Sequence, residues 1–361
     1  MWNVGAQREL TRTTALDVAY IGTRGSNLFR SYNIDVAFPG ANTITVNGPG
    51  PTDVPSNISG LQANRLYSAA GCTQFSTNST ITRNGVTSPV CISGPLAAIQ
   101  GITQRMSNGY SIYHGLQVKF TKSFSSGLEA LVSYTWSKEV DDLTVFVPYD
   151  DTFNKGLGST SSSAPDVPQN FVASFVYELP FGKGRHWMSA APVAMDTVLG
   201  GWQLNGIVKI QHGFPLVVTN GGANNGGLNS GFTNRAIYDA SRCGSSAPII
   251  NQVNTLSSTK GRLWFDTSCF SDGTTPTLGN AVAGNAWGPG FRNFDLRLSK
   301  TIKIREEMGL KLGLDAFNAF NTPHFSNPAV SCCTAQNSNF GVITGTQTNP
   351  RQLQIGASFT F

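Results

Sequence analysis

The amino-acid sequence over residues 113–142 is YHGLQVKFTKSFSSGLEALVSYTWSKEVDD, a segment in which apolar and polar side chains alternate. Leu116, Val118 and Phe120, for example, are each separated by one polar residue. A period of two places the apolar side chains on one face of a β-strand and the polar ones on the other. The alternation is interrupted at 125–127 by Ser-Ser-Gly, which is typical of a tight turn, and then resumes. The segment therefore predicts a β-hairpin with one apolar face.

The same alternation recurs along the chain and predicts nine strands. A strand of about ten residues, rising about 3.3 Å per residue and tilted by about 40°, spans roughly 25 Å. That is the height of the apolar band of an outer-membrane barrel. The expected strands cover residues 2–9, 16–20, 112–124, 128–137, 170–179, 202–211, 293–304, 310–316 and 352–361.

The connections between these strands alternate in length. Shorter links at about 11–13, 125–127, 180–200 and 305–308 alternate with long ones at 24–109, 140–168, 212–291 and 319–350. Outer-membrane barrels have short periplasmic turns and long extracellular loops, whereas nothing requires this alternation in the alternative fold, a soluble β-sandwich. We therefore expect an all-β fold: an antiparallel, up-and-down transmembrane β-barrel. Residues 1–361 would form one incomplete run of about nine strands with long extracellular loops.

Composition agrees with a membrane-spanning sheet. Only 12% of the residues are charged, against about 25% in soluble domains. No run of apolar residues is long enough for a transmembrane helix. The mean hydropathy of −0.11 suits strands that present only alternate side chains to lipid. The net charge of +5 is spread along the chain, so no nucleic-acid partner is expected.

The alternation also predicts which side chains face the outer-membrane lipid. The lipid-facing set is Leu116, Val118, Phe120, Val132, Phe175, Leu204, Val208, Leu296 and Ile355. The set expected on the concave side is Gln117, Lys119, Ser133, Gln203, Asn205, Arg297 and Gln354. Aromatic girdles at the two membrane interfaces are expected from Trp2, Trp136, Phe294 and Phe317 at the outer rim, and Trp202, Phe124, Tyr177 and Phe361 at the inner rim.

Several motifs along these strands occur in an order that resembles one family. Besides the hairpin quoted above, they are VAYIGTRGSNLFR (18–30), DVPQNFVASFVYELPFGKGR (166–185), GGWQLNGIVKIQHGFPLVV (200–218), NFDLRLSKTIKIRE (293–306), LDAFNAFNTPHFSNP (314–328) and RQLQIGASFTF (351–361). Together they are similar to the C-terminal part of the outer-membrane barrel of TonB-dependent receptors of the Oar-like type. The resemblance implies a barrel of about 22 strands, an N-terminal plug, a box that binds TonB, and uptake of an unidentified ligand.

The first residues, MWNVGAQREL, lack the basic start and apolar run of a secretory signal. Bacterial barrels of this kind also have even strand numbers. We therefore expect the signal peptide, the plug and the N-terminal strands to belong to a longer parent, and TonB to act only through those missing parts. The alternative function is a non-transporting surface protein, an adhesin or porin-like barrel that binds partners through its long loops. The apolar, aromatic ending at Phe359 and Phe361 resembles the signal read by the outer-membrane assembly machinery.

No pattern predicts catalysis, a cofactor or a metal site. His114, His186, His212 and His324 have no metal-ligand spacing and are interpreted as surface residues. The glycine-rich run at 219–231 lacks a phosphate-binding motif. An acidic loop offers oxygen ligands for Ca²⁺, although solvated loop carboxylates are the preferred interpretation; its residues are Glu139, Asp141, Asp142, Asp150 and Asp151.

The six cysteines all lie outside the predicted strands, in loops expected beyond the reducing cytosol. Pairing within each loop threads nothing through the barrel, so the expected disulfides are Cys72–Cys91 and Cys243–Cys269. The adjacent Cys332 and Cys333 could bond only to each other as a vicinal disulfide. Free thiols in mobile loops are the alternative for all three pairs.

Overall fold

The computed structural model describes residues 1–33, 45–47, 74–83, 86–93, 103–141, 166–221, 234–244, 256–257, 261–272, 279–304, 308–333 and 339–361. Within these ranges, no helix is long and apolar enough to cross a membrane. The one α-helix in the same ranges is α1 (Val193–Leu199).

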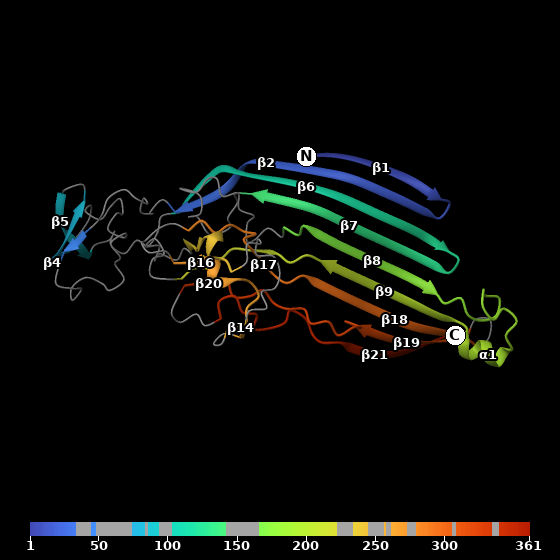
Figure 1. Cartoon of the computed structure of the whole chain (residues 1–361). Helices are drawn as coiled ribbons and strands as arrows, with labels where there is room; N and C mark the ends of the chain where they lie inside the picture. Colours follow the sequence, from blue (N-terminus) through green and yellow to red (C-terminus); the bar gives the residue numbers. More distant parts are fainter. Residues whose placement is uncertain are drawn as a thin grey trace.

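Most of the described chain forms one antiparallel sheet of nine strands (Figure 1). The strands follow each other across the sheet in the order of the sequence, which confirms the predicted all-β, up-and-down architecture. The sheet is open, with its first and last strands as edges. In order, the strands are β1 (Trp2–Thr11), β2 (Thr14–Asn33), β6 (Thr103–Ser125), β7 (Leu128–Asp141), β8 (Gln169–Glu178), β9 (Trp202–Gln211), β18 (Phe291–Lys303), β19 (Gly309–Phe317) and β21 (Gln352–Thr360).

The two ends of the sheet differ in their connections. The tight turns, α1 and the C-terminus lie at one end, and the long connections lie at the other (Figure 1). In the β6–β7 turn, Ser126 and Gly127 have φ values of 51° and 80°, a region that favours glycine. A Cβ on Gly127 would also lie 3.0 Å from the Glu178 carbonyl oxygen. Short turns of outer-membrane barrels face the periplasm, so we expect this end to be the periplasmic one, as the sequence also predicts.

One hairpin extends further than its sequence pattern predicts. Residues 24–109 were expected as one loop, but β2 continues to Asn33 and β6 begins at Thr103. The two strands stay paired from Gly25↔Ser111 to Asn33↔Thr103, with register shifts at 26–29. Apolar and polar residues do not alternate in this extension, and the backbone hydrogen bonds that hold it need no such alternation. The sequence pattern therefore detected only the alternating part of the hairpin.

The strand register separates the sheet into two faces. Cross-strand partners share a face, and the printed pairs connect Phe120 with Val132, Leu204 with Tyr177, and Ile355 with Leu314. Followed across all the strands, these pairs place the nine predicted lipid-facing residues together on one side, here called the apolar face. The seven residues predicted for the concave side share the opposite, polar face.

The buried hydrophobic core lies outside the nine-stranded sheet, in the long connections at the outer end. There the chain forms short strands and 3-10 turns that pair across large sequence distances. They are β10 (Pro215–Leu216), β11 (Thr219–Asn220), β12 (Asn234–Arg235), β13 (Ile237–Tyr238), η2 (Ala240–Arg242), η3 (Thr267–Cys269), β16 (Phe270–Ser271), β17 (Ala286–Trp287) and β20 (Ser331–Cys332). Two further small sheets are formed by β14 (Leu256–Ser257) with β15 (Gly261–Arg262), and by β3 (Thr45–Asn47), β4 (Gln74–Arg83) and β5 (Val86–Ser93).

Candidate functional site

The long connections at the outer end fold into a compact unit, here called the outer cap. It comprises residues 212–221, 234–244, 261–272, 279–290, 318–333 and 339–350. Three phenylalanine rings pack edge to face at its centre, with centroid distances of 5.5 to 6.1 Å. The buried side chains of this core belong to Leu216, Val218, Ala236, Phe265, Cys269, Phe270, Ala281, Ala286, Cys332 and Phe340.

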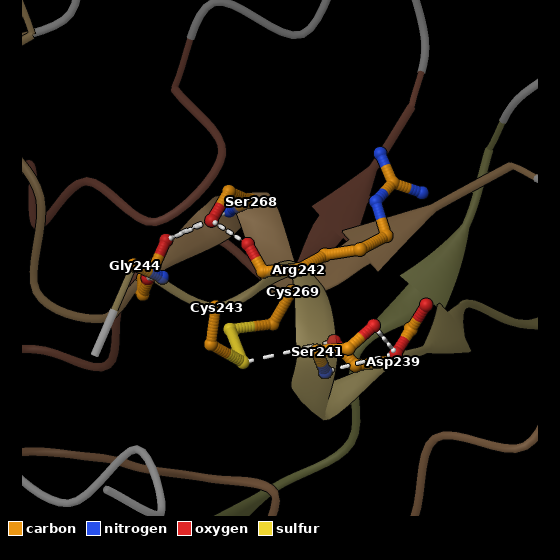
Figure 2. The surroundings of a disulfide bond; sticks show 8 residues. Asp239, Ser241, Arg242, Cys243, Gly244, Ser268 and Cys269 are labelled. Atoms are coloured by element: carbon orange, nitrogen blue, oxygen red, sulfur yellow. Dashed lines mark hydrogen bonds between the residues drawn. A yellow bond between two sulfur atoms is a disulfide. The ribbon is translucent and has the colours of Figure 1, made fainter. Parts of the chain in front are cut away.

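A disulfide joins Cys243 to Cys269, with a Cα–Cα distance of 4.6 Å (Figure 2). The bond connects the ends of the two 3-10 turns, η2 and η3. Beside it, the Ser268 hydroxyl donates to the Arg242 carbonyl at 2.9 Å, which ties the same two segments a second time (Figure 2). Cys269 is fully buried, so the bond is part of the cap's core.

Each of the two turns begins at an aspartate that caps it. Asp239 accepts from the hydroxyl and backbone N–H of Ser241, and these bonds lower the pKa of Asp239. Asp266 accepts from the hydroxyl and N–H of Ser268 and from the N–H of Gly244. Partial burial raises the pKa of Asp266, but the three hydrogen bonds together outweigh it and lower the pKa overall. Both carboxylates therefore act as charged helix caps near the disulfide.

A vicinal disulfide joins Cys332 to Cys333. Cys332 lies in β20, which pairs in parallel with β11 through Asn220↔Cys332. The Cys332 carbonyl also accepts from Gly221 N–H at 3.0 Å. The pairing of β11 with β20 fixes the connection between β19 and β21 against the connection that follows β9. The third expected bond, Cys72–Cys91, lies outside the described residues, because Cys72 does.

A cavity of about 580 Å³ opens on the polar face of the sheet. Its charged lining includes Asp295, Arg297 and Asp315, and the Arg297 guanidinium lies 3.5 Å from an Asp315 carboxylate oxygen. Asp295 accepts from the backbone N–H of Asn318 at 2.9 Å, which ties the strand to the base of the outer cap. The hollow shows that the polar face is concave at this point.

Apolar side chains also line this cavity. Leu131 and Val176 are exceptions to the sequence alternation, and both lie on the polar face together with Ile207. Phe317 was expected in the outer aromatic girdle, but this is wrong, because its partner is Gln352 on the polar face. A strand residue shares a face with its cross-strand partner. Phe317 therefore points to the concave side, like Asp315 two residues before it.

Three buried oxygens on the polar face have no hydrogen-bond partner among the described residues. They are Asn170 Oδ1, Asn205 Oδ1 and Ser299 Oγ. Burial of such a group without a partner costs about 1–3 kcal/mol. A water molecule enclosed beside these oxygens would remove that cost, so the polar face is unsuited to lipid.

The histidines lie far apart. His114 is bonded to the Tyr20 hydroxyl at 2.6 Å, and His212 to the Gly213 carbonyl at 2.9 Å. His324, interpreted from the sequence as a surface residue, is 3% exposed, so that interpretation is wrong. Its Nε2 donates to the Arg292 carbonyl at 2.8 Å, and its ring stacks on Phe291. Among the described residues, no cluster of His, Cys, Asp or Glu could hold a metal ion.

The acidic loop is described only in part. Glu139 and Asp141 lie at the outer end of β7, whereas Asp142, Asp150 and Asp151 lie outside the described residues. Asp166, which the sequence did not single out, is buried beside this end of β7. It accepts from Lys138 Nζ at 2.5 Å and from the Glu139 N–H at 3.1 Å. No sequence pattern indicated this ion pair, because its partners are separated by a long connection.

A model of the outer membrane beta barrel domain family matches residues 1–354 of the chain. None of the curated proteins compared with the chain matches it.

Solved structures with a similar arrangement include the outer membrane transporter YddB from Escherichia coli, at 10% identity and a TM-score of 0.39, with 99% of this chain and 32% of that chain covered. The ferric-catecholate import receptor Fiu from E. coli is similar at 12% identity and a TM-score of 0.32, with 100% and 35% covered. FpvA from P. aeruginosa is similar at 11% identity and a TM-score of 0.32, with 99% and 32% covered. The chain thus spans about a third of the length of these structures.

Proposed function

The chain belongs to the outer membrane beta barrel domain family, and from this premise we propose that it forms part of the wall of a TonB-dependent receptor that takes up an unidentified ligand. The observation that carries the proposal is the polar, concave face of the sheet. Its polar side chains and its cavity suit a hydrated passage beneath folded outer connections. The ordered motifs that resemble TonB-dependent receptors support the same function.

In this proposal the chain has no catalytic activity and no cofactor, and the ligand enters past the outer cap. The cap is held together by a disulfide and a hydrophobic core, so it can present a defined surface to a ligand. The same rigidity also favours a second candidate, a surface protein that binds a partner outside the cell without transporting it.

Comparison of the culture medium distinguishes the two functions. Cells with and without the gene are grown with active or inactivated TonB, and compounds depleted from the medium are identified by mass spectrometry. We expect at least one compound to be depleted only when both the gene and TonB are active. Depletion that persists without TonB would indicate a porin. If no compound depends on the gene and attachment to surfaces does, the protein is an adhesin.

We also propose that the outer-membrane assembly machinery recognises the C-terminal strand. Every residue of β21 is exposed, and the rings of Phe359 and Phe361 lie 6.3 Å apart. Deletion of Phe361 should reduce the amount of heat-modifiable barrel in outer-membrane fractions. An unchanged amount would show that the terminal aromatic ring is not the recognised element.

A further inference from the structure

The connection between β8 and β9, residues 179–201, contains an exposed apolar helix at the periplasmic end of the sheet (Figure 1). No residue of α1 is buried. Val193 is 74% exposed and Val198 is 65% exposed, and Leu199 is exposed as well. Side chains of this kind gathered at one exposed place mark a contact with a membrane or another molecule.

The C-terminal end of α1 is fixed to the apolar face of the sheet. Trp202 and Lys300 are cross-strand partners on that face. Trp202 Nε1 donates to the Val198 carbonyl at 3.1 Å, and Lys300 Nζ donates to the carbonyls of Val198 and Gly200. The ammonium also lies 4.9 Å from the centre of the Trp202 ring. A lysine on an apolar face is thus explained, because it binds the negative end of the helix.

The other half of the connection combines aromatic and basic side chains. The rings of Phe181 and Trp187 lie 4.9 Å apart, and both are exposed. Lys183 and Arg185 are exposed between them, and Arg185 also pairs with Glu178 at 2.6 Å. Aromatic rings at a membrane interface and basic groups near lipid phosphates are a common combination.

The two halves of the connection are tied together. The backbone N–H of Lys183 donates to Asp196 Oδ1 at 2.6 Å, so residues 181–187 and α1 are held as one unit. We expect the apolar face to contact lipid, and α1 is attached to that face, so the unit should lie where the acyl region meets the headgroups.

We propose that residues 179–201 bind the phospholipid of the periplasmic leaflet, with α1 at the level of the headgroups and Lys183 directed at lipid phosphate. Residues 179–201 are continuous with the apolar face, and their basic side chains complement lipid phosphate. Neither property depends on whether the protein transports a ligand. In this arrangement the connection anchors the inner rim of the sheet to the bilayer. The opposing possibilities are that the apolar helix is covered by another protein or remains in the aqueous periplasm.

Photo-crosslinking in living cells distinguishes these occupants. The variant Val198→p-benzoylphenylalanine is irradiated in its outer membrane, and the intact protein is weighed by mass spectrometry. We expect an adduct with the mass of a phospholipid. The same probe at Ile355, on the apolar face, is the positive control, and at Gln203, on the polar face, the negative control. An adduct with a protein or with a second copy overturns the proposal, as does absence of an adduct when Ile355 gives one.

Fluorescence provides a second measurement that does not need the unnatural residue. The protein purified from the outer membrane is placed in nanodiscs of phosphatidylethanolamine and phosphatidylglycerol, in which the phospholipids carry bromine near the headgroup end of their acyl chains. We expect bromine to quench Trp187, so the quenched share of the emission falls in Trp187→Phe. The matched variant Trp264→Phe removes an indole of the outer cap and should raise that share, because an unquenched emitter is lost. An equal response of the two variants would overturn the proposal.

Discussion

Removal of the Cys243–Cys269 disulfide should destabilise the outer cap while leaving the membrane-spanning sheet intact. The bond closes a loop with a sequence separation of 26 residues. For a loop of this length, the lost chain-entropy constraint corresponds to about 3.5 kcal/mol, within a typical range of about 2–4 kcal/mol. Because about 1.4 kcal/mol is a tenfold change, the Cys243→Ala/Cys269→Ala variant should expose cap amides about 300-fold more often.

Hydrogen exchange followed by mass spectrometry measures this effect on peptides from residues 236–244 and 263–272. The matched control is Cys332→Ala/Cys333→Ala, which removes a disulfide from the same unit but closes no loop, because its sequence separation is 1. Cys269 and Cys332 are both fully buried, so the loss of packing is comparable in the two variants. If exchange in the first variant accelerates by less than about 30-fold, or by no more than in the control, the loop-closure argument is refuted.

Three further predictions concern the sheet, the cap and the turn. Ile355→Arg places a charge near the middle of β21 on the apolar face and should lower the free energy of unfolding in vesicles by about 2–4 kcal/mol. Gln354→Arg, on the opposite face, should change it little, and equal losses in guanidinium titrations would contradict the assignment of the faces. Because the pKa values of Asp239 and Asp266 are lowered in the folded cap, their stabilisation is complete above the unfolded pKa of about 3.9 and is lost as the pH falls through the folded values. Exchange of the Ser241 and Ser268 amides, corrected for intrinsic rates, should therefore accelerate only in acid, and Asp266→Asn should abolish that acceleration at Ser268. Gly127→Ala forces a side chain into a φ of 80° and should cost about 1–3 kcal/mol, whereas Ser126→Gly should not destabilise the turn; similar unfolding midpoints for the two variants would argue against backbone strain there.

Side-chain placement shows where reasoning from the sequence succeeded and where it did not. The alternation of apolar and polar residues located every strand of the nine-stranded sheet. It also predicted the order of the strands, because each one pairs with the strands of the sheet that come before and after it in the chain. It missed the outer extension of β2 and β6, where apolar and polar residues no longer alternate. The sequence prediction misplaced Phe317, because this aromatic residue near a strand end was assigned to a girdle without regard to the face of the sheet on which it lies. Its partner Gln352 shows that this is the polar face.

The sequence predicted less of the candidate site than of the fold. Cys243 and Cys269 were singled out, since cysteines in one loop have few partners, but nothing local indicated the buried Asp166 or His324. Both residues owe their role to contacts with segments far away in the sequence. A periodic pattern reports only which face a side chain shares with its near neighbours, so it carries no signal for such contacts.

The sequence by itself therefore determined the class of fold, the strand order and the division into an apolar and a polar face, because all three follow from a local period of two and from pairing between successive strands. Only the tertiary structure established that the outer connections fold into a cap with its own core, and that Lys300 on the apolar face holds the end of α1. Both features join residues that are distant along the chain, and their free energy comes from burial and hydrogen bonds that exist only once those residues have met.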